Sequence, residues 1–157
     1  MSLHFLAWLA NTAVADWVNS SSYVWPALES THFVSLCVLA GSLLVIDLRL
    51  IGFYRKLSSS TMLLLIRLSL AAFAVNLGTG LLFFAGNTPK YLDNPAFELK
   101  MALILVAGLN AVFFKVRLGH LVETSEVTRS SIGVGYLSLF LWAGVIVCGR
   151  MITFYAR

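Results

Sequence analysis

Four apolar stretches without Asp, Glu, Lys or Arg stand out in this sequence, and they constrain the fold more than any other feature. They cover residues 30–46, 68–89, 101–114 and 130–149. A helix that crosses a bilayer needs about 20 predominantly apolar residues, and long cationic side chains at its ends can reach the interface. Flanking residues such as Arg67, Lys100 and Lys115 can therefore extend these stretches. The sequence predicts transmembrane helices at 26–54, 60–86, 96–118 and 131–155.

The composition agrees with a membrane protein and excludes other classes. The 157 residues are 59% hydrophobic, with a mean hydropathy of +0.88, and 11 Lys or Arg plus 7 Asp or Glu make 18 charged side chains. A soluble domain of this length carries about 40, roughly a quarter of its residues. The charge is also too sparse for a surface that follows nucleic-acid phosphates. We therefore expect the lipid bilayer as a partner and no nucleic acid, in one membrane domain over 1–157.

The segment before the first span has a different character. Residues 3–18 are apolar but too short to cross, and they include Trp8, Asp16 and Trp17. Tryptophans are common at headgroup depth, where amphipathic helices lie in the membrane plane. The expected fold is therefore an all-α, four-helix membrane bundle with an N-terminal interfacial helix. Cys37 and Cys148 both lie in apolar runs, so we interpret them as free thiols.

Basic residues indicate the orientation, because cytoplasmic loops carry an excess of Lys and Arg. The connections between spans one and two and between spans three and four are basic, whereas the two lysines near the remaining connection are offset by acidic residues. We expect a bacterial inner-membrane protein with both termini in the periplasm. Arg150 and Arg157, near the end of the last span, are the exceptions to this pattern.

Ionisable residues in the first span indicate a polar site at each of its ends. Glu29 and Asp47 are 18 residues apart, which is five helical turns, and His32 lies one turn from Glu29. An ionisable group within a span is costly unless it faces protein or water, so we expect this face to point inward. Near the periplasmic end, Lys100 and Arg150 reach a similar depth, and a Glu29–Arg150 ion pair is the first expectation.

At the cytoplasmic end, the candidate partners of Asp47 are basic side chains. They include Arg49, Arg67, Lys115 and Arg117. An alternative is that the polar residues at both ends of the span only form ion pairs, which fix the register of the helices. Asn76 and Asn110 are amides near the middle of their spans, where they either bond to a neighbouring helix or line a polar path.

Metal and haem binding are both open at the periplasmic site. Thioether and thiolate ligands suit copper(I), and Met101 and Met151 lie near the helix ends that also hold His32. A b-type haem usually needs two histidines on facing helices, but His32 alone is well inside a span, so haem would need a methionine ligand or a second copy of the chain. Glu29 and His32 form a Glu-x-x-His motif, but a di-iron bundle needs a second such motif on another helix, and the sequence contains none. No nucleophile–base pair, phosphate loop or zinc-ligand spacing indicates an enzyme.

The singled-out residues also resemble a known family. The matching segments are Trp25 to His32, Asp47-Leu48-Arg49-Leu50 with Gly52, Asn94-Pro95-Ala96-Phe97 with Lys100, and Asn110, Trp142 and Gly149-Arg150. Together they resemble small bacterial four-span membrane proteins known only as a domain of unknown function. This resemblance implies an inner-membrane four-helix architecture and no settled activity. Four-helix membrane cytochromes and copper-resistance membrane proteins are looser resemblances, and the chain lacks the paired histidines of the cytochromes.

Three functions follow from these observations. The first is a site at Glu29 and His32 that binds or transfers a transition metal, haem or proton. The second is a channel or small-solute transporter, in which Asp47, Asn76 and Asn110 face a path. The third is a structural subunit of a larger membrane complex. Four closely connected helices enclose little volume, so we expect a homo-oligomer.

Overall fold

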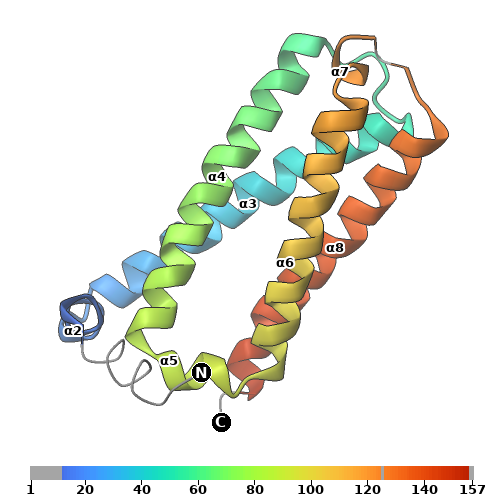
Figure 1. Cartoon of the computed structure of the whole chain (residues 1–157). Helices are drawn as coiled ribbons and strands as arrows, with labels where there is room; N and C mark the ends of the chain where they lie inside the picture. Colours follow the sequence, from blue (N-terminus) through green and yellow to red (C-terminus); the bar gives the residue numbers. More distant parts are fainter. Residues whose placement is uncertain (1–11, 125, 156–157) are drawn as a thin grey trace.

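The computed structural model describes residues 12–124 and 126–155, and within them the chain is helical, with no strand (Figure 1). Four segments are long and apolar enough to cross a membrane, which confirms the all-α, four-span fold. These spans are α3 (Val24–Ile51), α4 (Ser59–Gly86), α6 (Pro95–Phe113) continued by the π-helical turn η1 (Phe114–Leu118), and α8 (Arg129–Tyr155). Their bounds differ from the expected ranges by three residues or fewer.

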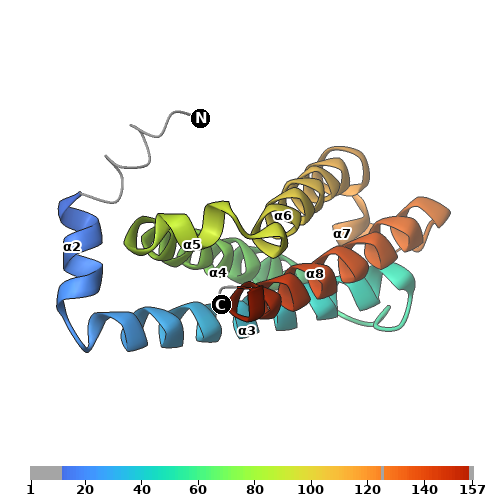
Figure 2. The ribbon, with the colours of Figure 1, turned by 90° about the horizontal axis from the view of Figure 1, so that it is seen from below.

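Three shorter helices complete the described chain: α2 (Ala13–Ser20), α5 (Thr88–Leu92) and α7 (Leu121–Thr124). Helix α2 lies across the start of α3 and packs against the end of α4 (Figure 2). There the Asn19 amide donates to the Gly86 carbonyl oxygen at 2.9 Å, and Val18 is fully buried. Helix α2 contains the described part of the expected interfacial segment 3–18; the rest of that segment lies outside the described residues.

Short polar side chains fix the helix ends. The Ser58 hydroxyl accepts from the Thr61 amide at 3.2 Å before α4. The Asn94 side chain accepts from the Ala96 amide at 3.0 Å before α6, which also has a proline in its first turn. These residues satisfy amide groups that a helix start leaves without partners. Helix α3 ends at Gly52, whose φ of 108° suits a residue without a side chain.

The four spans do not pack equally on one another. Helix α3 packs against both α4 and α8, and α6 packs against α8, whereas α4 and α6 are not a closely packed pair. Figure 2 shows α4 and α6 on the same side of the α3–α8 pair. Accordingly, α3 and α8 are the more buried spans, and α4 and α6 expose more surface to lipid.

Helices α3 and α8 approach each other closely beside Gly135. A Cβ atom at this position would lie 2.9 Å from Ile51 Cγ1 and 3.0 Å from the Asp47 carbonyl oxygen. Small residues let helices in a membrane pack at close range. The absence of a side chain at Gly135 therefore sets where Asp47 lies relative to α8.

The two ends of the bundle differ in their packing. The Asp47 end, where α3 finishes and α8 begins, holds a buried apolar cluster covered by η1 and α7: Ile46, Leu50, Met62, Leu118, Leu121, Val122 and Val134. There the Ser131 hydroxyl donates to the Leu50 carbonyl oxygen at 3.0 Å. The opposite end, here called the His32 end, is formed by the start of α3, α2, α5 and the end of α8 (Figure 1).

Candidate functional site at His32

A group of polar side chains crosses the α3–α4 interface at the His32 end. His32 Nδ1 lies 2.7 Å from Thr79 Oγ1, and one turn along the interface the Asn76 amide donates to the Ser35 hydroxyl at 2.7 Å. Ser35 and Thr79 are buried. Hydrogen bonds between membrane helices contribute about 0.6 to 2 kcal/mol each. The bond from Asn76 agrees with a role in helix association.

The hydrogen bonds of Thr79 favour one tautomer of His32. A threonine hydroxyl has one proton, and Thr79 Oγ1 lies 2.9 Å from the Val75 carbonyl oxygen and 3.1 Å from that of Asn76. We interpret the hydroxyl as donating to its own helix, which leaves it to accept from His32. In this arrangement His32 carries its proton on Nδ1, and Nε2 presents a lone pair. Nε2 makes no hydrogen bond with the residues that the structure describes.

The ring of His32 is held by apolar packing as well. The Phe83 ring meets it edge-on, with centroids 5.5 Å apart, and Phe83 also packs against Trp25 at 5.2 Å. His32 is partly buried. A histidine that donates from one nitrogen and is packed in place is typical of a ligating imidazole.

Lys100 brings a positive charge from α6 to this site. It is close enough to His32 for their charges to interact, and its Nζ lies 3.6 Å from the position that a Cβ at Gly149 would occupy. It also interacts electrostatically with Cys148, which is buried on α8. Lys100 is therefore near enough to act on His32 through its charge, and its role as a charge partner of this site stays a prediction.

Glu29 differs from the expectation that it faces inward. It is exposed, and its Oε1 accepts from the Trp25 indole at 2.9 Å. The reason is local: Trp25 lies one turn earlier on α3 and offers a nearby donor at the helix start. Arg150 is also exposed, and its pairing with Glu29 stays a prediction. Tyr91 on α5 lies near enough to Glu29 to interact with its charge. The pKa of Tyr91 is raised, mainly because the side chain is partly buried and in addition because Glu29 is negatively charged.

The other two candidate metal ligands are methionines on two different helices. Met101 is exposed on α6 and Met151 is partly buried on α8. Among the described residues, no three His, Cys, Asp or Glu side chains gather in a way that could hold a metal ion. Cys37 and Cys148 are free thiols, as predicted.

At the Asp47 end, the structure gives Asp47 a partner other than the basic residues. The carboxyl is 3% exposed and hydrogen-bonds to the Ser138 side chain of α8. The buried Arg49 instead donates from Nη2 to the Val122 carbonyl oxygen at 3.1 Å, and Arg67 is exposed. An ion pair of Asp47 with either arginine stays a prediction.

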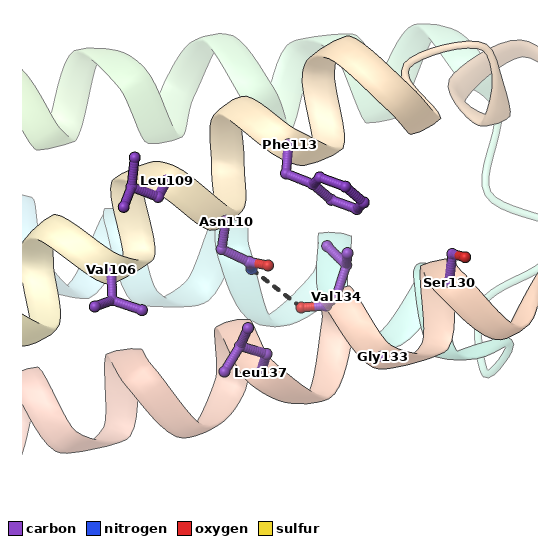
Figure 3. A pocket seen from close by; sticks show the side chains of 8 residues that line it. All are labelled: Val106, Leu109, Asn110, Phe113, Ser130, Gly133, Val134 and Leu137. Atoms are coloured by element: carbon purple, nitrogen blue, oxygen red, sulfur yellow. Dashed lines mark hydrogen bonds between the residues drawn. The ribbon is translucent and has the colours of Figure 1, made fainter.

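Asn110 links the two spans α6 and α8. Its amide nitrogen donates to the Val134 carbonyl oxygen at 3.2 Å, as Figure 3 shows. Beside it lies a hollow of about 460 Å³ whose other walls are mainly apolar. Leu109 and Leu137 in these walls are 62% and 44% exposed, so the hollow is on the lipid-facing side of the α6–α8 pair.

Sequence reasoning missed the hydroxyl partners Thr79 and Ser138. A signal for the first was present, because Ser35 follows His32 by three residues and Thr79 follows Asn76 by three. Matching three-residue spacings place each pair on one helical face, so two antiparallel helices can meet through both pairs. No comparable spacing indicated Ser138.

These features define a small multi-pass membrane protein with polar side chains buried between its spans. A model of a protein family matches residues 5–155, and its description is "Family of unknown function (DUF6644)". The chain therefore belongs to the family DUF6644, which agrees with the four-span family that its motifs resemble. Neither the comparison with curated proteins nor that with solved structures gives a match.

Proposed function

We propose that this membrane protein binds haem through His32, and that the Nε2 lone pair at the His32 end is the iron ligand. The observation that carries this proposal is the hydrogen bond between His32 Nδ1 and Thr79 Oγ1. It holds the orientation of the ring, as the outer partners of ligating histidines commonly do, and we interpret it as leaving Nε2 unprotonated. When bound, haem would supply electron transfer or ligand binding at its iron.

Two features favour haem over a bare metal ion or a proton. A porphyrin brings four nitrogen ligands of its own, so His32 with one further ligand, from a methionine or from a second copy of the chain, can hold it, whereas the described residues offer no group of three His, Cys, Asp or Glu ligands. The charge of Lys100 near His32 disfavours a further cation or a protonated imidazole. The same charge favours a ligand that carries carboxylates.

An absorption spectrum of the purified protein tests the proposal. Protein produced with a supply of haem should show a Soret band, which His32→Ala removes. His120→Ala is the matched control, because His120 is exposed on the segment before α7. Lys100→Gln should weaken haem retention, whereas Lys115→Gln, at an exposed position on η1, should not.

Several results would contradict the proposal. Wild-type protein that takes up no haem from added haemin would exclude it, and a Soret band that persists in His32→Ala would exclude this ligand. Elemental analysis that finds stoichiometric copper without a Soret band would favour the transition-metal alternative instead. Haem at one molecule per two chains would support a homo-oligomer that shares the group.

We propose further that the Asp47 end faces the cytoplasm of a bacterial inner membrane. Exposed basic residues gather at this end: Arg55, Lys56, Lys115, Arg117 and Arg129. Those at the opposite end are fewer, and Asp93 and Glu98 offset them. An excess of Lys and Arg marks cytoplasmic loops. Impermeant labelling of cysteines introduced at Lys56 and Lys90 should modify only the second from the periplasmic side; labelling of the first would reverse the orientation.

A second candidate function is transport of a small solute. Asp47 and Asn110 line one interior cavity, which favours this alternative, whereas Asn76 is engaged with Ser35.

A further inference from the structure

An interior cavity of about 290 Å³ lies between the four spans towards the Asp47 end. Its walls are mostly aliphatic and aromatic, and Asp47 is the only ionisable side chain among the described residues that line it. A mainly apolar cavity with a few convergent polar groups is the usual form of a small-molecule site. The polar groups here are Asp47, Ser69, Asn110 and Ser138.

Asp47 lines this cavity, and one oxygen of its carboxyl has no hydrogen-bond partner among the described residues. The Ser138 side chain hydrogen-bonds to the carboxyl, but Oδ2 is fully enclosed and has no hydrogen-bond partner among the described residues. The side chains that could compensate it are engaged elsewhere: Asn110 donates to the Val134 carbonyl oxygen and Ser69 to that of Ile66. A buried carboxylate without compensation is costly, so this site favours either a protonated carboxyl or a positively charged group beside it.

The cavity opens towards lipid between α4 and α6. These two helices do not pack closely, and the lining residues Leu70 of α4 and Val112 of α6 are 64% and 59% exposed. Gly108 on the same rim is exposed and has nothing within 4 Å of its Cβ position. A ligand with an apolar body can therefore enter the cavity from the hydrocarbon region.

Aromatic side chains complete the match to a cation. Phe73 of α4 and Trp142 of α8 line the cavity and meet edge-to-face, with centroids 6.3 Å apart. Aromatic faces attract ammonium groups, most strongly where water is excluded. A bare inorganic cation would instead need several oxygen ligands, which these apolar walls do not supply.

We propose that this cavity binds a monovalent organic cation with an apolar body, whose ammonium group pairs with Asp47. The site is separate from the haem site proposed at His32 and does not rest on it. If the protein transports a small solute, as in the second candidate function, the solute would be such a cation.

Equilibrium dialysis of labelled benzyltrimethylammonium against the protein in lipid nanodiscs tests the proposal. Wild-type protein should bind it, and Asp47→Asn should weaken binding about 30-fold or more, since loss of one partner from a buried charge pair is costly. Asp93→Asn is the control, because this carboxylate is exposed at the end of α5. His32→Ala should also leave binding unchanged, which separates this site from the haem site.

A second pair of variants does not depend on Asp47. Gly108→Leu should obstruct the cavity and weaken binding, and Gly78→Leu is its match, since Gly78 also has nothing within 4 Å of its Cβ position and does not line the cavity. Absence of binding by the wild type overturns the proposal. So does equal binding by a folded Asp47→Asn variant, or equal weakening by the two leucine variants. Should Asp47→Asn fail to fold, the leucine pair decides alone.

Discussion

Replacing Gly135 by alanine should separate α3 from α8 and destabilise the bundle. The added Cβ would lie 3.0 Å from the Asp47 carbonyl oxygen and 2.9 Å from Ile51 Cγ1. The isoleucine side chain can rotate away, but the carbonyl oxygen belongs to the backbone of α3 and can move only with the helix. Overpacking of this kind costs about 1 to 3 kcal/mol.

Gly133→Ala is the matched control, because Gly133 lies on the same helix with nothing within 4 Å of its Cβ position. Alanine favours a helix over glycine by about 1 kcal/mol, and this gain is common to both variants. The difference between their free energies of unfolding should therefore be about 1 to 3 kcal/mol, with Gly135→Ala the less stable. Reversible unfolding by sodium dodecyl sulfate in mixed micelles measures it. Equal stability of the two variants would refute the close approach of α3 and α8.

Two further substitutions test other contacts. Asn110→Leu removes the bond to the Val134 carbonyl oxygen and should lower the free energy of unfolding by about 0.6 to 2 kcal/mol; an unchanged value would show that this bond does not hold α6 to α8. Gly86→Ala places a Cβ 2.8 Å from Val18 Cγ1, so α2 should detach and the chain near residue 21 should become sensitive to protease, whereas unchanged protection would place α2 elsewhere.

The fold was predictable from the sequence because the bilayer imposes one strong condition. Four long stretches free of charge can satisfy their backbone groups in lipid only as helices, and the proline and asparagine residues around Asn94 mark a helix start. The pairing of the spans was less accessible. Nothing in the sequence shows that α4 and α6 are not closely packed, because all four spans are strongly apolar.

The candidate site was predictable only in part. Helical spacing placed His32 and Asp47 on the inward side of one helix, and depth placed Lys100 near His32. The partners of these groups depend on how the helices are rotated about their axes, which hydropathy does not encode. Glu29 therefore turned to the nearby Trp25, and Asp47 to a serine of α8, where charge alone had favoured arginines.

The central claim is that His32 presents an unprotonated Nε2, because Thr79 accepts the proton of Nδ1. Nitrogen-15 NMR of haem-free protein tests it directly, in a variant in which His4 and His120 are replaced by glutamine so that His32 is the only histidine. At neutral pH the ring should be neutral with its proton on Nδ1, and Thr79→Val should abolish this preference. A proton on Nε2, or the same spectrum in Thr79→Val, would contradict the account.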